Sequence, residues 1–385
     1  MLVHTADWHV KAHTWSNRPD IKGDSEFSIK QIVDFCLKTK ADLLVAGDIF
    51  DVPRPDNVSV RLVQEAFHRL VQEGVQVSYL CGNHDPISWC DTSPELQSGV
   101  CHIQLGECDY IFPDGSRLAG FDYIHKSVIE ETFSTIPEDV QMIAVHQFFK
   151  ESGSHGSAQC SLDDVPDHVK LVLAGDIHKK LDYTNELGQR LLYPGSPIPT
   201  KISDCGDKGF WLIKSVDDVE HIPIFSRPFI EFESDGTDLD KIVKQVKKLR
   251  VEFLKKTKGV ADKELLDEVS KPLVKFAFII DDTPGLDKKL AEKLDGAGFV
   301  FPYPVSRQSK AVLEAIQTTD IEELKTATFL TYLKEEVDKD ESPELFNVLE
   351  SFLSGAELFS SLTQLAKDVG LEKNQISNLL PKAKY

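Results

Sequence analysis

Residues 41–51 read ADLLVAGDIFD, an apolar run that leads directly into a glycine and two carboxylates. A short apolar run rich in branched residues and closed by glycine is typical of a buried β-strand. In an α/β sheet, sites are assembled at the carboxyl ends of strands, because each loop there starts from a rigid element and faces a shared crevice. We therefore expect Asp48 and Asp51 to lie at the functional edge of a sheet.

The same feature recurs after other predicted strands. Metal-capable side chains follow four further apolar runs: Asp7 and His9 after LVHTA, Asn83 and His84 after VQVSYLCG, His146 at the end of MIAVH, and Asp176 and His178 after VKLVLAG. Carboxylate, amide and imidazole ligands without a thiolate suit manganese, magnesium, iron or zinc rather than a soft metal. The alternation of such strands with helical patterns predicts an α/β domain.

These side chains are more than one ion needs. The candidate ligands are Asp7, His9, Asp48, Asn83, His146, Asp176 and His178. They would fill the shells of two adjacent ions if one carboxylate bridges the ions and water completes the coordination. Two ions about 3.5–4 Å apart can activate a water, neutralise phosphate charge and stabilise an in-line displacement. The set therefore predicts a two-metal centre for phosphoester hydrolysis.

The turn LCGNHDP, residues 80–86, crowds an amide, an imidazole and a carboxylate together. An ordinary polar turn that caps backbone groups is one explanation. Within the two-metal interpretation, Asn83 is a ligand, and His84 faces the substrate and protonates the leaving oxygen, a role worth about 10²–10⁴ in rate. We expect the carboxylate of Asp51 to hydrogen-bond His84 and keep it charged. Asp85 is expected to orient backbone groups.

Three segments are expected along the 385 residues, because the chain is too long for one ordinary core. Residues 1–225 form the α/β domain, with helices predicted over 28–39 and 57–73. A small α+β domain follows over 226–310, and it begins with a Lys-rich helical stretch. Residues 320–385 have a helical pattern.

The motifs DWH, GDIFD, GNHD, AVH and GDIH, in this order over residues 7–178, resemble those of the calcineurin-like metallophosphoesterases. The resemblance implies a four-layer α/β/β/α sandwich. Within that superfamily, GDIFDVPRPDN, YPGSP and the KGFWLI strand resemble the SbcD-type DNA exonuclease subunit, the bacterial and phage counterpart of the nuclease of the MRN repair complex. This narrower resemblance implies that residues 226–310 are a capping domain.

The resemblance also assigns ligands to each ion, motif by motif. The first ion would have Asp7, His9, Asp48 and His178, and the second Asp48, Asn83, His146 and Asp176. Manganese is the implied metal, with magnesium, iron or zinc as alternatives. One position departs from the family, whose last motif usually reads GHxH, because Asp176 stands in place of the first histidine. A carboxylate still ligates, but its negative charge can shift the metal preference.

The implied activity is that of a manganese-dependent DNA exonuclease with some endonuclease activity, in an SbcCD-like complex for double-strand-break repair or recombination. The five motifs alone serve other reactions, so a phosphatase or cyclic-nucleotide phosphodiesterase with a small substrate is an alternative. The long segment after residue 225 favours the nuclease, because a minimal phosphatase needs neither a cap nor a helical tail. The intact ligand set disfavours a scaffold that has lost its chemistry.

A net charge of −20 excludes a protein that grips nucleic acid over its whole surface, since phosphate binding needs clustered Lys and Arg. Residues 238–258 are an exception, with eight basic and three acidic residues. A solvated helix face explains this local charge, and a DNA-backbone contact is the alternative. Under that alternative, we expect the DNA-binding residues to include His13, Lys244, Lys247 and Lys248.

The tail SLTQLAKDVGLEKNQISNLL, residues 361–380, has the spacing of a helix-turn-helix. DNA binding, a helical hairpin that docks on a partner, and plain packing all fit this pattern. The SbcD-type resemblance implies that helices after the capping domain dock on an SbcC-type coiled-coil ATPase. It also implies a homodimer of this chain within a heterotetramer.

Seven cysteines, scattered and never spaced as CxxC, argue against a disulfide framework or a thiolate zinc site. They are expected to be reduced, inert thiols. No run reaches the roughly 18 apolar residues that a membrane helix needs, and MLVHTADWHV lacks the regions of a signal peptide. We expect a cytoplasmic protein with no membrane contact, located in the host cytoplasm if it is phage-encoded.

Overall fold

The computed structural model describes residues 1–11, 14–15, 18–85, 100–102, 108–153, 158–279 and 283–305. Every strand predicted for residues 1–225 is present, and four short strands add to them. His13, the segment 320–385 and the helix-turn-helix pattern within it lie outside the described residues. Among the described residues, no helix combines the length and the apolarity that crossing a membrane requires.

The first sheet is mixed and has the strand order β12-β11-β1-β2-β3-β4. Its strands are β1 (Leu2–Thr5), β2 (Asp42–Ala46), β3 (Val77–Leu80), β4 (Val100–His102), β11 (Lys208–Ile213) and β12 (Val219–Ile224). β1 to β4 are parallel, and β11 and β12 extend the sheet in antiparallel fashion beside β1. The carboxyl ends of β1, β2 and β3 therefore meet at one edge.

The second sheet has the order β5-β6-β7-β8-β10-β9. Its strands are β5 (Cys108–Ile111), β6 (Arg117–Phe121), β7 (Met142–His146), β8 (Leu171–Gly175), β9 (Leu181–Thr184) and β10 (Arg190–Tyr193). The four central strands are parallel, and the edge strands β5 and β9 are antiparallel to their neighbours. β7 and β8 thus direct their carboxyl ends the same way.

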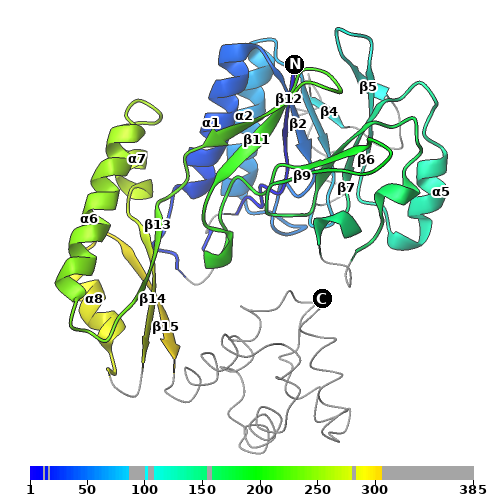
Figure 1. Cartoon of the computed structure of the whole chain (residues 1–385). Helices are drawn as coiled ribbons and strands as arrows, with labels where there is room; N and C mark the ends of the chain where they lie inside the picture. The colour runs from blue at the N-terminus through cyan, green and yellow to red at the C-terminus, as the bar shows by residue number, and fades with distance from the viewer. Residues whose placement is uncertain are drawn as a thin grey trace, which may run out of the picture.

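Alternating side chains place the two sheets face to face. In β2, Leu44 and Ala46 belong to the core between the sheets, which also contains Leu118, Ala144 and Leu173 of the second sheet. Side chains on the opposite face of the first sheet pack against α1 (Asp24–Thr39) and α2 (Asn57–Gln72). Side chains on the outer face of the second sheet pack around α5 (Ile129–Ser134). Figure 1 shows these layers from α1 and α2, through the sheets, to α5.

Helix α2 begins where the sequence predicts. The Asp56 side chain accepts hydrogen bonds from the backbone amides of Val58 (2.9 Å) and Ser59 (3.0 Å). Such an N-cap contributes about 1 kcal/mol. Helix α1 begins at Asp24, four residues before the predicted start at residue 28. Contacts of Asp24 and Phe27 with residues after 226 stabilise this additional first turn.

A second unit follows residue 226 and has a three-stranded sheet of its own. It contains β13 (Phe229–Glu233), α6 (Leu239–Lys256), α7 (Lys263–Val269), β14 (Leu273–Ile279), α8 (Leu286–Leu294) and β15 (Phe299–Val305). All three strands are parallel and alternate with helices, which differs from the expected α+β arrangement. The physical reason is that parallel neighbours need crossover connections, and the helices provide them.

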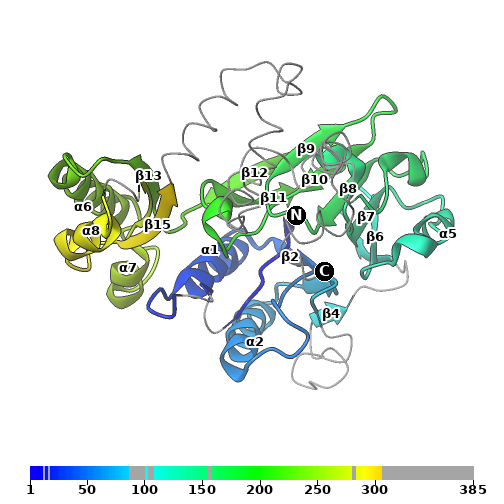
Figure 2. The ribbon, with the colours of Figure 1, turned by 90° about the horizontal axis from the view of Figure 1, so that it is seen from below.

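Arg227 joins this unit to the first. Its side chain is 0% exposed, and its five N–H groups donate to the Asp24 carboxylate (2.8 and 3.0 Å) and to the carbonyl oxygens of Lys22, Glu268 and Lys271. An apolar cluster that contains Phe27 of α1 and residues of α6 and α7 lies next to this pair. Figures 1 and 2 both show the second unit on the side of α1, away from α5.

Candidate metal centre

The loops that follow β1 and β2 run side by side. The backbone amide of Asp7 donates to the carbonyl of Gly47 (3.0 Å), and that of His9 donates to the carbonyl of Asp48 (2.9 Å). Six non-glycine residues have positive φ in the described parts of the chain, and four are predicted ligands: Asp7 (54°), His9 (44°), Asp48 (51°) and Asp176 (95°). Such backbone costs on the order of 1 kcal/mol per residue and clusters at functional sites. The sharp turns aim side chains of successive motifs at one place.

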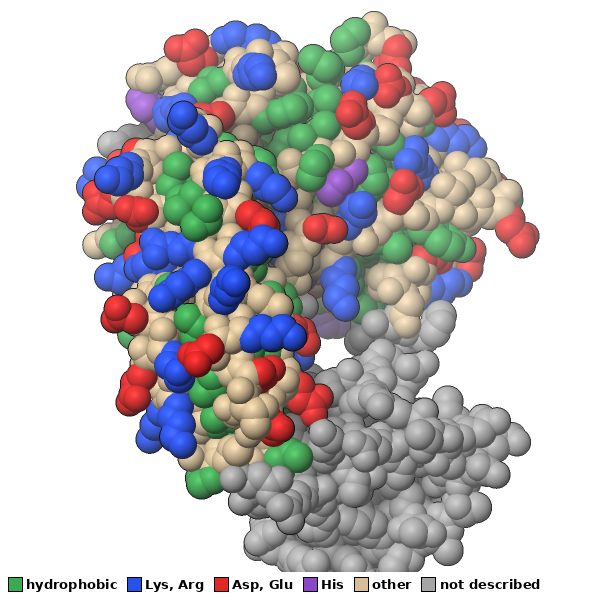
Figure 3. All heavy atoms as spheres, turned by 60° about the vertical axis from the view of Figure 1, so that its left-hand side comes forward, with side chains coloured by type: hydrophobic (Ala, Val, Ile, Leu, Met, Phe, Trp, Pro, Cys, Tyr) green, Lys and Arg blue, Asp and Glu red, His purple; other side chains and the backbone are tan. Residues whose placement is uncertain are grey.

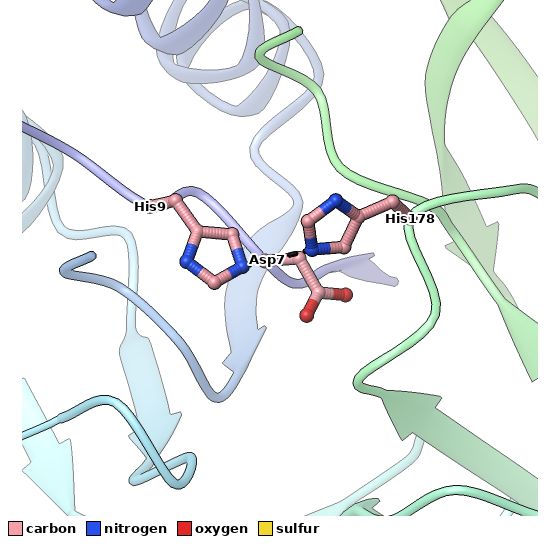
Figure 4. Close-up of side chains that lie close together, drawn as sticks. All are labelled: Asp7, His9 and His178. Atoms are coloured by element: carbon pink, nitrogen blue, oxygen red, sulfur yellow. Dashed lines mark hydrogen bonds between the residues drawn. The ribbon is translucent and has the colours of Figure 1, made fainter. Parts of the chain in front are cut away.

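Three predicted ligands meet although they are distant in sequence, with His9 and His178 169 positions apart. Asp7, His9 and His178 each offer a ligand atom within 4.8 Å of the others. The Nε2 atoms of His9 and His178 are 2.9 Å apart, and Figure 4 shows the Asp7 carboxylate beside the two rings. Two imidazole nitrogens that face each other at this distance are suited to a shared cation.

A second group is formed by Asp7, Asp48 and His146. The Nδ1 atom of His146 donates to the carbonyl of Ala46 (2.8 Å), so its Nε2 atom is the one placed to bind a cation. That Nε2 is buried without a hydrogen-bond partner among the described residues and lies 3.4 Å from Asp48 Oδ2 and 3.9 Å from Asp176 Oδ1. A backbone contact that fixes the tautomer and leaves the other nitrogen facing carboxylates is typical of a metal ligand. The donor set therefore fits divalent cations.

Two glycines make room for these side chains. A Cβ atom on Gly82 would lie 2.1 Å from Asp48 Oδ1, and one on Gly47, where φ is 84°, would lie 2.3 Å from His146 Nδ1. Any side chain at either position would displace a predicted ligand. The glycines of the GDIFD and GNHD motifs are thus part of the construction of the site.

Burial and mutual charge set the protonation of the cluster. Burial raises the pKa of Asp7 to about 7. Burial alone would lower the pKa of His146, but the charge of Asp48 outweighs it and raises the pKa to about 10. Burial acts to raise the pKa of Asp48, yet His146 and His9 hold it below its usual range. The cluster thus holds protons that a cation must displace.

His84 lies at the edge of this cluster. Its backbone amide donates to Asp48 Oδ1 (3.0 Å), its ring is perpendicular to that of His9 at 5.2 Å, and it forms a third potential ligand group with His9 and Asp48. Its Nδ1 atom contacts the main-chain oxygen of Asp51 (2.8 Å). The predicted contact with the Asp51 carboxylate is therefore wrong: that carboxylate accepts from Lys11 Nζ (2.9 Å). The turn after β2 brings the Asp51 carbonyl, rather than its side chain, to the imidazole.

Asp85 orients backbone groups, as expected. Its carboxylate accepts from the amides of Phe50 (2.9 Å), Ile49 (3.2 Å) and Gly82 (2.9 Å). These bonds connect the GDIFD loop to the GNHD turn. Burial, together with the charge of Asp48, raises the pKa of Asp85 to about 6.

Two predicted ligands lie at the periphery. Asn83 is exposed, and its role as a ligand stays a prediction. The amide of Asp176 donates to Asp7 Oδ1 (3.0 Å), while its carboxylate remains 23% exposed near His146. The predicted DNA contacts Lys244, Lys247 and Lys248 are exposed on α6 in the second unit, not among the metal-binding loops.

Asp204 is a residue that the sequence analysis missed. Its Oδ2 atom lies 3.3 Å from His178 Nδ1 and accepts from Thr200 Oγ1 (3.0 Å). Burial alone would lower the pKa of His178, but the hydrogen bond to Asp204 raises it. A carboxylate behind a ligating histidine fixes its orientation. No spacing rule signals this residue, because it lies 26 positions away, at the end of a short 3-10 helix (Ile202–Asp204).

Carboxylates and imidazoles meet at the converging strand ends of two packed mixed sheets, and this set of ligands fits divalent cations. Residues 1–180 match the family model of the calcineurin-like phosphoesterases. This part of the chain is therefore similar in sequence to that family.

Relatives of the chain are distant. It is 26% identical over 239 residues to the "uncharacterized metallophosphoesterase YhaO" of Bacillus subtilis, covering 55% of this chain and 56% of that protein. It is 22% identical over 290 residues to the "DNA double-strand break repair protein Mre11" of Methanococcus maripaludis (65% and 74%). It is 26% identical over 102 residues to one subunit of the nuclease SbcCD of Escherichia coli (25% and 24%). The chain thus spans little more than half of the first of these relatives.

Proposed function

We propose that the chain is a two-metal phosphodiesterase that acts on DNA, the manganese-dependent exonuclease and endonuclease subunit of an SbcCD-like repair or recombination complex. The observation that carries the hydrolytic part is the unpartnered, buried Nε2 of His146 facing Asp48 and Asp176. Support for DNA as substrate comes from the names of two relatives. Residues 1–225 would be the nuclease domain and 226–310 its cap.

The side chains would divide between two ions. One ion would take Asp7, His9, Asp48 and His178, and the other Asp48, Asn83, His146 and Asp176. When bound, the ions supply water activation and neutralise the charge of the phosphate. Burial of Asp7 and His146, both 0% exposed, keeps bulk water from competing for these positions.

His84 would act on the substrate directly. Its Nδ1 atom donates to the Asp51 carbonyl, which fixes the ring and leaves Nε2 to carry the second proton of the imidazolium. That proton would pass to the leaving oxygen as the P–O bond breaks. The hydrogen bond from the His84 backbone amide to Asp48 Oδ1 holds His84 beside the predicted bridging carboxylate.

The exposed face of α6 would contact the DNA backbone. Lys and Arg side chains gather over the unit that carries α6 (Figure 3), with acidic side chains among them. Lys248 lies 3.7 Å from Glu252, whereas Lys244 and Lys247 make no ion pair within the described parts of the chain. These two lysines are the stronger candidates for phosphate contacts.

We further propose that residues 320–385 dock on an SbcC-type coiled-coil ATPase, with two copies of this chain in the assembly. Deletion of this segment is expected to leave hydrolysis of bis-p-nitrophenyl phosphate unchanged and to abolish association with the ATPase. Continued co-elution of the truncated chain with the ATPase on size exclusion would overturn this part.

The test of the activity uses metal-stripped full-length protein with Mn²⁺ or Mg²⁺. Its substrates are bis-p-nitrophenyl phosphate and end-labelled single- and double-stranded DNA, with and without the ATPase and ATP. We expect Mn²⁺-dependent cutting of both kinds of substrate. Hydrolysis of the small ester, with DNA left intact even when the ATPase and ATP are present, would favour a small-substrate phosphatase or cyclic-nucleotide phosphodiesterase instead.

A further inference from the structure

A second group of potential metal ligands lies outside the centre described above. Cys81, His102 and Asp122 each offer one ligand atom, and these atoms lie within 4.8 Å of one another. The Cys81 side chain follows β3, His102 ends β4 and Asp122 follows β6. Cys81 is 3% exposed, and the side chains of His102 and Asp122 are 15% and 26% exposed.

The geometry favours a cation over a nucleophilic triad. In a triad, the histidine turns one ring nitrogen to the nucleophile and the other to the carboxylate. Here a single nitrogen, His102 Nε2, lies 3.6 Å from Cys81 Sγ and 2.9 Å from Asp122 Oδ1. One proton on that nitrogen serves only one of these partners, whereas a cation serves all three atoms.

The separation of the sulfur from the imidazole nitrogen also suits zinc. A tetrahedral ion with a thiolate at about 2.3 Å and an imidazole at about 2.0 Å holds those two atoms about 3.5 Å apart, close to the 3.6 Å between Cys81 Sγ and His102 Nε2. The imidazole is held by stacking on Tyr79, with ring centroids 4.9 Å apart and planes 5° apart. The Cys81 amide donates to Asp122 Oδ1 (2.7 Å), which orients the carboxylate as outer-shell bonds do.

We propose that Cys81, His102 and Asp122 bind Zn²⁺ or another thiophilic divalent cation, with water in the fourth position. The site connects an edge of the first sheet, through β3 and β4, to β6 of the second. Its thiolate separates it chemically from the oxygen and nitrogen ligands of the other centre. Under this proposal Cys81 would not be the inert thiol expected from the sequence, because folding places a histidine and a carboxylate beside it.

The site also supports the turn that carries His84. The backbone carbonyl of Cys81 accepts from the amide of Tyr123 (2.8 Å), and Gly82 follows directly. A bound cation would therefore stiffen the base of the Gly82–Asp85 turn without touching the reacting atoms. This role does not depend on the substrate being DNA.

Cobalt is the probe, because Co²⁺ substitutes for zinc and a thiolate ligand produces a near-ultraviolet charge-transfer band. Full-length protein, reduced and stripped of metal, is titrated with Co²⁺. We expect a thiolate band whose final intensity corresponds to one Co²⁺–thiolate site per chain, whatever Co²⁺ the other centre takes up, and which disappears when Zn²⁺ is added. Co²⁺ in the Asp and His centre produces no such band, so this readout is independent of hydrolysis.

Variants locate the thiolate. Cys81→Ser is expected to abolish the band, and His102→Gln to weaken Co²⁺ binding at this site at least as much as the about 10–100-fold that loss of an outer-shell partner costs. Cys205→Ser is the matched control, since Cys205 lies outside this cluster with its Sγ near the Lys201 carbonyl, and it should keep the band. Circular dichroism checks that each variant is folded. If Cys81→Ser does not fold, the His102→Gln variant tests the site in its place. Absence of the band in the wild type, or its persistence unchanged in the folded variants, overturns the proposal.

Discussion

The Nδ1 atom of His178 lies 3.3 Å from the Oδ2 atom of Asp204, so a carboxylate stands behind one of the two histidines that face each other in the metal centre. Asp204 itself is 9% exposed and is held by Thr200. His178 enters the centre from a half-buried turn after β8, and the contact with Asp204 fixes which nitrogen points at His9.

Asp204→Asn is therefore expected to weaken Mn²⁺ binding by about 10–100-fold, the usual cost of losing an outer-shell partner. Titration calorimetry on metal-stripped protein measures the affinity. Asp207→Asn, at an exposed carboxylate of the same loop, is the control and should bind as the wild type does. Equal affinities for the two variants would show that Asp204 does not position His178.

Asp48→Ala is expected to remove both Mn²⁺ binding and hydrolysis, because Asp48 belongs to two of the potential ligand groups. Metal content by mass spectrometry and the rate with bis-p-nitrophenyl phosphate are the two measurements. Asp167→Ala, at an exposed position, controls for loss of one carboxylate. Near-normal manganese occupancy in Asp48→Ala would contradict the bridging role.

His84→Gln is expected to lower turnover by about 10²–10⁴-fold while the metal content stays the same. Asp51→Asn should have a much smaller effect on turnover, since the imidazole contacts the Asp51 main chain and not its carboxylate. Steady-state kinetics with the small ester compare the two variants. A His84→Gln protein with full activity removes the general-acid assignment.

Metal affinity is expected to rise with pH between about 6 and 8. In the metal-free protein, the pKa of Asp7 is about 7 and that of His146 about 10, so both hold protons that a cation must displace. Raising the pH through this range deprotonates Asp7 and makes the His146 proton easier to displace, so binding tightens. Calorimetry in buffers of different ionisation enthalpy should detect the release of protons on metal binding. An affinity that does not change with pH would refute the competition between protons and the cation.

Arg227→Met is expected to lower the free energy of unfolding by about 3–5 kcal/mol, because it leaves the Asp24 carboxylate buried without its partner. Arg190→Met breaks the Arg190–Asp182 pair, which is 28% and 39% exposed, and should cost no more than about 1 kcal/mol. Urea unfolding compares the two. Equal losses of stability would mean that the buried Arg227–Asp24 pair contributes no more to the free energy of unfolding than a surface ion pair does.

Much of the first domain follows from local sequence. The apolar runs that end at Asp7, Asp48, His146 and Asp176 are all strands, because burial and strand propensity act over a few neighbouring residues. A ligand-capable side chain directly after a buried strand is also a local feature. For this reason the sequence alone indicates which segments meet at the metal centre and the order in which they occur.

Contacts across loops depend instead on how the two sheets pack. The approach of Asp204 to His178, the main-chain contact from Asp51 to His84 and the meeting of Cys81 with His102 and Asp122 all join residues that no local pattern relates. The three-residue strand β4 carries a weak apolar signal of its own. It forms because β3 presents an open edge of the first sheet, so its placement required the assembled fold.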